Sequence, residues 1–290
     1  MILTITPNPT VDRVYFIDNL EYGKVYRADK FKCSAGGKGI NVAKVSKILE
    51  SRVSAMGFVG GNTGDYIKNE ISRLGICCEF TDVSGDTRTN VNISDSRGQS
   101  AEILEPGPSI TDGEQINFFD SFTKACNNFN VICASGSLPR GLNSSFYSDI
   151  IKISSENNKR VIVDTSGETL KDILSFKPYM VKPNIDELSY LLGGEITTNQ
   201  DIKDGLLFLY EKGVKVPFIT LGAEGGAAYI DNKFYKFIAP EVKVINAVGS
   251  GDSTIAGIAV GIDRGMNIIN SLSLEWLPGQ QILNLKRPAL

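Results

Sequence analysis

The sequence predicts an α/β protein, in which a mostly parallel central sheet is covered by helices on both faces. Short apolar runs alternate with longer segments of helical periodicity along most of the chain. The apolar runs lack the polar alternation of half-exposed strands, which indicates strands buried on both faces. The chain has 290 residues, of which 42% are hydrophobic and 22% charged, so it is long enough for one large domain of this class.

Each element of this prediction corresponds to a stretch of sequence. The candidate strands of the central sheet are residues 2–6, 53–60, 130–135, 160–165, 179–183 and 216–220. The candidate helices between them are residues 40–50, 65–74, 114–126, 145–156 and 201–212. No internal repeat and no low-complexity linker divides the chain, so we expect a single three-layer α/β/α domain over residues 1–290.

Two segments, residues 11–18 and 87–94, alternate between apolar and polar side chains more clearly than the rest. Further short β-like stretches follow them near 26–32 and 99–104. Alternation is typical of strands with one exposed face, so these segments predict a second, smaller sheet. We expect it to form a lid over a site, a homodimer contact, or both. The two insertions that build this lid run approximately over residues 10–33 and 86–105.

Composition excludes several classes of function. The net charge is −3 and the isoelectric point is about 5.3, without any basic run, so we expect no nucleic-acid partner. No apolar stretch is long enough to cross a membrane and no signal segment opens the chain, so we expect a cytoplasmic protein. The chain has no histidine, which argues against zinc sites and against Ser–His or Cys–His catalysis. Its chemistry must rest on carboxylates, lysines, arginines and backbone dipoles.

The stretch "AVGSGDS", residues 247–253, combines a glycine-rich turn with an acid at the start of a predicted helix. Gly249, Ser250 and Gly251 permit consecutive N–H groups to converge, and such a helix start binds anions such as a phosphoryl group in transfer. Asp252 fits two interpretations: an ordinary acid of a helix N-terminus, or a general base that takes a proton from an attacking hydroxyl. The motif alone does not decide between them.

A second glycine-rich stretch, "SAGGKGINVAK", covers residues 34–44. Gly36 and Gly37 permit close approach of a ligand, while Lys38 and Asn41 supply a cation and an amide for hydroxyls or phosphate. A flexible turn with a solvated lysine explains an isolated "GGKG" equally well. The stretch lacks the spacing of a Walker A loop, and no G-x-G-x-x-G occurs, which argues against a Rossmann-type oxidoreductase.

Two further stretches follow predicted strands. In "VKPNIDEL", residues 181–188, Asn184 and Glu187 fit a helix capping box, or a site that organises Mg²⁺-bound phosphates through water at the end of a parallel strand. In "TLGAEGGAAYI", residues 220–230, glycines follow a strand at the position where a nucleotide's sugar or phosphates would approach.

Taken together, "GGKGIN", "SGSLPRG", "KPNIDEL", "TLGAEGG" and "AVGSGDS" occur in the order and approximate spacing of the ribokinase-like PfkB family of carbohydrate kinases. The resemblance runs from residue 1 to about residue 270. The opening "TPNPTVDRV" resembles the branch that contains 1-phosphofructokinases and tagatose-6-phosphate kinases. It implies a ribokinase-like fold, ATP and Mg²⁺ as cofactors, and a sugar phosphate as the second small-molecule partner.

The resemblance also implies roles for individual residues. Asp252 matches the catalytic base, and Gly249 to Gly251 match the anion hole. Asp12 matches a ligand of sugar hydroxyls. The residues that match the sugar-binding turn are Gly36, Gly37, Lys38 and Asn41, and those that match arginines near the substrate's phosphate are Arg88 and Arg27. The nucleotide side comprises Lys182, Asn184, Glu187, Thr220, Gly222 and Gly225, with Asn184 and Glu187 reaching Mg²⁺ through water.

The reaction implied is ATP-dependent phosphorylation of a ketohexose phosphate. We expect fructose 1-phosphate, converted to fructose 1,6-bisphosphate, because Arg13 follows Asp12 as in many 1-phosphofructokinases; the alternative is tagatose 6-phosphate, converted to tagatose 1,6-bisphosphate. Residues 271–290 depart from the family, with Pro278 where a helix should run. This atypical tail raises a further alternative, a sugar-phosphate-binding protein with impaired nucleotide binding.

Overall fold

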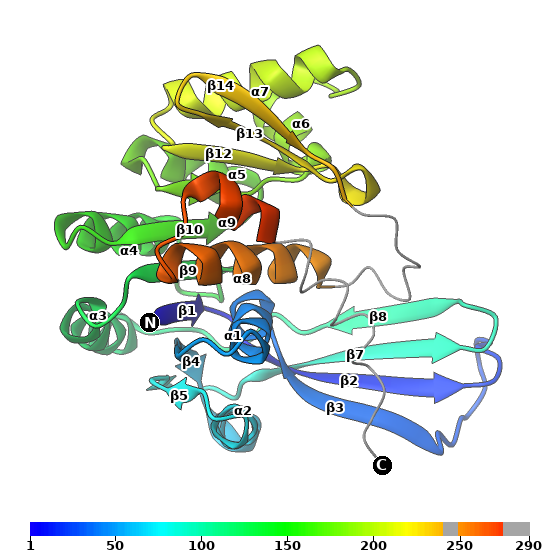
Figure 1. Cartoon of the computed structure of the whole chain (residues 1–290). Coiled ribbons are helices and arrows are strands. Elements are labelled where there is room, and N and C mark those ends of the chain that lie inside the picture. The colour runs from blue at the N-terminus through cyan, green and yellow to red at the C-terminus, as the bar shows by residue number, and fades with distance from the viewer. Residues whose placement is uncertain (240–248, 275–290) are drawn as a thin grey trace.

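The computed structural model describes residues 1–239 and 249–274, and among these residues the strands form two sheets (Figure 1). The larger, ten-stranded sheet has the order β14-β13-β12-β11-β10-β9-β1-β4-β5, and β6 also pairs with β4. Its strands are β1 (Ile2–Thr6), β4 (Val53–Val59), β5 (Cys77–Cys78), β6 (Thr81–Asp82), β9 (Val131–Ser135), β10 (Arg160–Asp164), β11 (Met180–Val181), β12 (Val216–Thr220), β13 (Gly226–Ile230) and β14 (Lys233–Phe237). All pairs are parallel from β5 and β6 to β12, and β13 and β14 continue the sheet antiparallel.

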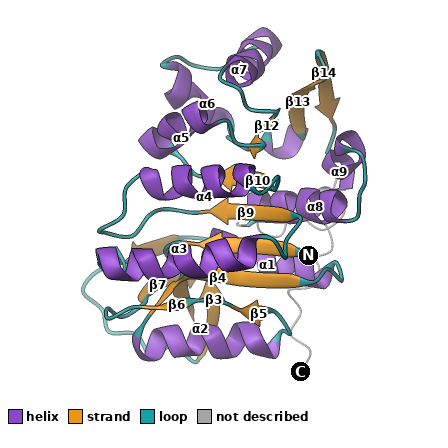
Figure 2. Cartoon of the chain, turned by 90° about the vertical axis from the view of Figure 1, so that its left-hand side faces the viewer, coloured by secondary structure: helices purple, strands orange, loops and turns teal. Residues whose placement is uncertain are grey.

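Helices cover both faces of this sheet (Figure 2). They are α1 (Lys38–Ile48), α2 (Gly61–Arg73), α3 (Asp112–Cys126), α4 (Ser145–Glu156), α5 (Gly167–Ile173), α6 (Ile185–Leu192), α7 (Asn199–Glu211), α8 (Ser250–Asp263) and α9 (Ile268–Leu274). Successive side chains of a strand point to opposite faces of the sheet, so those of β1 pack in two different cores. Leu3 and Ile5 pack in the core under α3 to α7, whereas Ile2 packs in the core under α1, α8 and α9. A third cluster packs α1 and α2 against β4.

The smaller sheet, which we call the lid sheet, has the order β3-β2-β7-β8. Its strands are β2 (Thr10–Ile17), β3 (Lys30–Gly36), β7 (Arg88–Asp95) and β8 (Ser100–Leu104). It projects sideways from the central sheet (Figure 1). Three residues separate β1 from β2, and only Gly37 separates β3 from α1. The base of the lid sheet therefore lies at the carboxyl end of β1, where ligands of open α/β sheets bind.

The predicted fold class, parallel core and second sheet are confirmed, and the predicted strands of the central sheet agree with the structure to within a few residues. The strand expected at 26–32 is wrong: β3 runs from Lys30 to Gly36, because its antiparallel pairing with β2 places Gly36 opposite Thr10. Helix α2 begins four residues earlier than expected, at Gly61. The sequence analysis missed α5 and the β13–β14 hairpin.

Within residues 1–239 and 249–274, no helix combines the length and the apolar character needed to cross a bilayer. Of the atypical tail, residues 271–274 complete α9, and residues 275–290 lie outside the described residues. The part of the glycine-rich stretch before Gly249 lies outside them as well.

Candidate active site

Helix α8 begins at Ser250, directly after Gly249. Gly249 is its N-cap and has a φ of 83°, a left-handed conformation that favours glycine, and no side chain of the described residues caps the helix. The first N–H groups of a helix have no partner within the helix, so those of Ser250, Gly251 and Asp252 are available to an anion. The helix dipole adds partial positive charge at this point.

Asp252 lies buried in the first turn of α8, with 6% of its surface exposed. The Asn41 side-chain amide donates a hydrogen bond to its Oδ2 at 2.8 Å. Burial raises the pKa of Asp252 to about 6, and the negative charge of Asp164 adds to the increase. The hydrogen bond from Asn41 and the cationic charges of Lys38 and Lys182 oppose it. A carboxylate with a pKa slightly below neutral is well suited to act as a general base.

Asp164, the last residue of β10, holds two lysines next to this acid. Its Oδ2 lies 3.3 Å from Lys38 Nζ and its Oδ1 lies 3.7 Å from Lys182 Nζ. Burial favours a lower pKa for Lys38, but the charges of Asp164, Glu187 and Asp252 raise it, so Lys38 remains cationic at neutral pH. A Cβ added at Gly251 would lie 3.3 Å from Lys182 Nζ, which places this cation beside the start of α8.

Sequence reasoning missed Asp164 as a site residue, although it treated residues 160–165 as a strand. The signal was an acid that ends an apolar strand, because the carboxyl ends of parallel strands share one edge of the sheet.

At the base of the lid sheet, Asp12 of β2 faces Gly36 of β3. A Cβ on Gly36 would collide with the Asp12 carboxylate, so this position requires glycine. The Asn90 side-chain amide donates to Asp12 Oδ1 at 3.3 Å. Burial raises the pKa of Asp12, opposed by the hydrogen bond from Asn90 and by the charges of Arg88 and Lys44. The Gly36–Gly37 turn leads directly into α1, so it connects Asp12 to the two α1 residues that contact the other half of the site, Lys38 and Asn41.

Arg88 begins β7 and lies at the same base. Its Nη2 donates to the Asn8 carbonyl at 2.9 Å and its Nη1 to the Glu105 carbonyl at 3.3 Å. Its Nε is buried without a hydrogen-bond partner among the described residues. Burial lowers the pKa of the guanidinium, and the charge of Asp12 partly offsets this effect. The structure thus brings the side chain of Arg88 close to Asp12.

Arg27 does not join this group. Because Phe16 pairs with Lys30, the segment between β2 and β3 lies at the end of the lid sheet opposite the Asp12–Gly36 base. We call this end of the lid sheet the lid tip. A hollow of about 610 Å³ lies there, and Arg27 lines it together with Lys24 and Tyr26. Within one chain, the structure therefore separates the two arginines that the sequence analysis placed near the substrate's phosphate.

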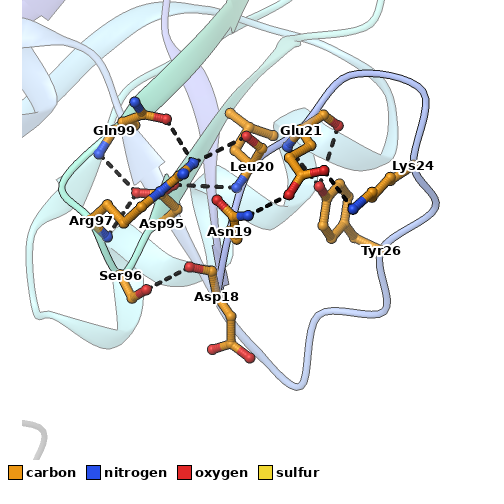
Figure 3. Close-up of polar contacts among 10 residues, drawn as sticks. All are labelled: Asp18, Asn19, Leu20, Glu21, Lys24, Tyr26, Asp95, Ser96, Arg97 and Gln99. Carbon is orange, nitrogen blue, oxygen red and sulfur yellow. Dashed lines mark hydrogen bonds and ion pairs between the residues drawn. The ribbon is translucent and has the colours of Figure 1, made fainter.

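Asp95 holds the lid tip together (Figure 3). Its carboxylate accepts hydrogen bonds from the N–H groups of Leu20, Arg97 and Gln99, at 3.2, 2.9 and 2.9 Å, and forms an ion pair with the Arg97 guanidinium at 2.9 Å. Burial favours a higher pKa, but these hydrogen bonds outweigh it and lower the pKa of Asp95 to about 2. This acid is fully occupied in joining the segment after β2 to the β7–β8 hairpin.

Asn184 and Glu187, which the sequence analysis assigned to the nucleotide side, form a capping box at the start of α6. Asn184 Oδ1 accepts from the Glu187 N–H at 2.7 Å, and Glu187 Oε2 accepts from the Asn184 N–H at 3.0 Å. The Thr220 N–H donates to the Pro183 carbonyl at 3.1 Å, which brings the end of β12 alongside this cap.

The two glycines after β12 differ. Gly225 has a φ of 108°, and a Cβ there would collide with the Phe237 carbonyl, so the turn into β13 requires it. Gly222 has a φ of 59°, and no atom of the described residues lies within 4 Å of an added Cβ. Of these two predicted nucleotide-side positions, only Gly222 lacks a structural explanation in its packing.

Comparison with known proteins identifies relatives of this chain. The family model for pfkB family carbohydrate kinases matches residues 5–274. A tagatose-6-phosphate kinase of Staphylococcus epidermidis is 40% identical over 265 residues, which cover 90% of this chain and 85% of that protein.

Solved structures share the fold of this chain. A protein of Thermotoga maritima, described as a possible 1-phosphofructokinase, is 26% identical with a TM-score of 0.88, covering 98% of this chain and 92% of that one. The tetrameric inhibited form of phosphofructokinase-2 from Escherichia coli shares the fold, with a TM-score of 0.89 at 23% identity, covering 98% of this chain and 94% of that one. The family model spans the lid sheet, the central sheet and the start of α8, and the chain belongs to the pfkB family of carbohydrate kinases.

Proposed function

We propose that this kinase transfers the γ-phosphoryl group of ATP to a hydroxyl of a ketohexose phosphate. The observation that carries the proposal is the buried carboxylate of Asp252, whose pKa is raised to about 6, in the first turn of helix α8, which no side chain of the described residues caps. A carboxylate beside a helix start supports the proposal, because phosphoryl transfer to an alcohol requires a group that accepts the proton and a group that stabilises negative charge.

In the proposed reaction, the substrate's hydroxyl oxygen forms a bond to the γ-phosphorus while the bond from that phosphorus to the bridging oxygen of ADP breaks. Asp252 accepts the hydroxyl proton, and ADP leaves with the bonding electrons. The N–H groups of Ser250 and Gly251, together with Lys182, offset the negative charge that moves across the phosphoryl group. Asp12 orients the sugar hydroxyls, and Arg88 supplies positive charge for the substrate's own phosphate.

The residues present fit a magnesium ion that is held through water. Mg²⁺ prefers carboxylate oxygens and usually keeps several waters. Asp164 Oδ1 is buried without a hydrogen-bond partner among the described residues, and Glu187 uses only its Oε2 in the capping box. Asp164 and Glu187 would hold the ion through water, with Asn184 beside them. When bound, the ion would neutralise charge on the phosphates of ATP.

Two substrates are candidates. The sequence analysis favours fructose 1-phosphate because Arg13 follows Asp12. In the structure, Arg13 is adjacent to Asp12 in β2 and exposed, so it points to the opposite face of the lid sheet and does not support this choice. The similarity to tagatose-6-phosphate kinases favours tagatose 6-phosphate. We therefore rank tagatose 6-phosphate first and fructose 1-phosphate second.

The experiment is turnover of the full chain with Mg-ATP and each ketohexose phosphate, with formation of the bisphosphate measured directly. Higher kcat/KM for tagatose 6-phosphate supports the ranking, and the reverse result restores fructose 1-phosphate. Turnover of neither, together with tight binding of a sugar phosphate and no binding of ATP by titration calorimetry, would support the impaired binding protein that the atypical tail suggests.

We also propose that two copies associate through the lid sheet. Its exposed apolar side chains, with at least 40% of their surface accessible, are Phe16, Phe31, Ile103 and Leu104. The strand registers place Phe31 and Ile103 on one face of this sheet and Phe16 and Leu104 on the other. Exposed apolar side chains on a sheet face are typical of interaction surfaces, and we propose the face of Phe31 and Ile103 as the contact. A Phe31→Asp substitution should convert a dimer to a monomer in sedimentation analysis, and a monomeric parent chain would contradict the proposal.

A further inference from the structure

The outer strand of the lid sheet is held at its base by side chains of two neighbouring helices. β3 is at the edge of the sheet, so alternate peptide groups face away from β2. Tyr66 Oη of α2 donates to the Cys33 carbonyl at 3.1 Å. Two residues after Cys33, at Ala35, both backbone groups are bound. The N–H donates to Glu70 Oε2 at 2.7 Å, and the carbonyl accepts from Lys44 Nζ at 2.6 Å.

Lys44 and Glu70 also form an ion pair with each other, with 2.8 Å between Nζ and Oε1. The result is a closed ring of three charge-assisted hydrogen bonds, in which the two side chains are 22% and 24% exposed. We call this ring, formed by Lys44, Glu70 and the backbone of Ala35, the edge clamp. The two side chains cannot exchange places in this ring, because the N–H of Ala35 needs the carboxylate of Glu70 and its carbonyl needs the ammonium group of Lys44.

The edge clamp lies next to the Gly36–Gly37 turn, the part of the site with the greatest backbone freedom. Ala35 precedes the consecutive glycines Gly36 and Gly37, and glycine gives a backbone the largest conformational freedom. Gly36 lies against the Asp12 carboxylate, and Gly37, with a φ of 109°, leads into α1. Without a fixed residue before them, the two glycines would leave both Asp12 and the start of α1 less well placed.

We propose that Lys44 and Glu70 are positioning residues for sugar-phosphate binding, because the edge clamp fixes the Gly36–Gly37 turn against Asp12. The inference rests on the proposed function, in which Asp12 orients the sugar. It predicts that the two side chains affect binding of the sugar phosphate and not binding of the nucleotide. In the proposed function, the nucleotide binds at α6, α8 and the end of β12.

The first test compares Glu70→Gln and Lys44→Met with Asp82→Asn. The control removes the ion pair between Lys68 of α2 and Asp82, with 2.8 Å between Nζ and Oδ1. Within the described residues, these two charged groups form no hydrogen bond or ion pair with the lid sheet. We expect the KM for the ketohexose phosphate to rise about tenfold in both clamp variants, with the KM for ATP changed less than about twofold. Lys44→Arg, which keeps the donor and the charge, should remain close to the parent.

The second test exchanges the charges in the double variant Lys44→Glu/Glu70→Lys. This variant keeps an ion pair between α1 and α2 but presents the wrong partner to each group of Ala35. We expect the KM defect to persist. Recovery to the parent value would show that only the ion pair matters and would overturn the proposal, as would equal changes in KM for both substrates in the single variants.

Amide hydrogen exchange at Ala35 tests the clamp without any turnover. Exchange should be slow in the parent and in Asp82→Asn and at least about tenfold faster in the charge-exchanged variant, since the N–H then loses its acceptor. Unchanged exchange overturns the clamp itself. If exchange responds as expected but neither ketohexose phosphate is turned over, the proposed function fails while the clamp stands.

Discussion

The start of α8 and the lid tip each contain an aspartate with a buried side chain, and the two acids differ in the number of donors around them. Among residues 1–239 and 249–274, Asp252 accepts one hydrogen bond, from the Asn41 side chain, and burial raises its pKa to about 6. Asp95 accepts three backbone N–H groups and an arginine, and its pKa falls to about 2. A satisfied carboxylate holds a structure together, whereas an under-satisfied one keeps the capacity to take a proton.

Removing the charge of each aspartate in turn distinguishes their roles by the largest expected effect. Asp252→Asn should lower kcat by about 10²- to 10⁴-fold, the usual contribution of a general base, while the affinity for ATP is largely kept. Asp95→Asn, which neutralises an acid distant from the base of the lid sheet, should leave kcat within about twofold of the parent. Steady-state kinetics with Mg-ATP measures both. Substantial turnover in Asp252→Asn would contradict the assignment.

A smaller effect is expected at Asp164, which pairs with both lysines of the site. Asp164→Asn leaves Lys38 and Lys182 without this counter-charge, and we expect kcat to fall about 10- to 100-fold, as for other groups that orient a site. The charge of Asp164 also raises the pKa of Asp252. The acidic limb of the pH profile should therefore move to lower pH, and a move to higher pH would show that this interaction has been assigned the wrong sign.

The two acids should affect stability in opposite directions. The folded-state pKa of Asp252 is raised from 3.8 to about 6, so its protonated form stabilises the fold below pH 4, and this stabilisation is lost as the pH rises through 6. At neutral pH the raised pKa, which is the net effect of burial and of the neighbouring groups, corresponds to a cost of about 3 kcal/mol, because one pKa unit is worth about 1.4 kcal/mol. Asp252→Asn should raise the melting temperature at pH 7 by a few degrees and change it little at pH 4.

Asp95 has a lowered folded-state pKa, so its contribution is present above about pH 4 and is lost as the pH falls towards 2. Asp95→Asn should lower the melting temperature at pH 7, and the difference from the parent should shrink in acid. Thermal unfolding at several pH values measures both variants. Changes of the same sign at pH 7 would remove the distinction between the two acids.

The smallest effect is expected at Asn41, whose hydrogen bond lowers the pKa of Asp252. Asn41→Ala should move the acidic limb of kcat/KM to higher pH. Because Asp252 is still ionised in alkaline solution, the loss attributable to this shift should be a few-fold at pH 7 and should diminish at pH 8. A loss that is the same at both pH values would indicate that Asn41 acts on the substrate alone.

Much of the fold and part of the candidate site could be predicted from the sequence. The buried strands were predicted because apolar runs report burial on both faces, and the place of Asp252 followed from a glycine turn before a helix. The position of β3 could not be predicted from local sequence, because its pairing with β2 decides which residues of this polar edge strand are extended. Asp164 and the pair Lys44–Glu70 were missed for a related reason: each acts through a contact between distant segments, which local pattern does not encode.

The same limit explains Arg27. Its sequence neighbourhood resembles that of the family, but the length of β2 and β3 carries it to the lid tip, away from Asp12. Strand length and register set that separation. Residue type at one position gives no information about either.

The central claim is that a single buried carboxylate, Asp252, accepts the proton of the attacking hydroxyl. The pH dependence of kcat/KM between pH 5 and 8, measured on the parent chain and on Asn41→Ala with the preferred ketohexose phosphate, tests it most directly. The account predicts a decline below about pH 6 in the parent and a limb at higher pH in the variant. A parent profile that stays flat down to pH 5, or a limb that does not move in the variant, would contradict it.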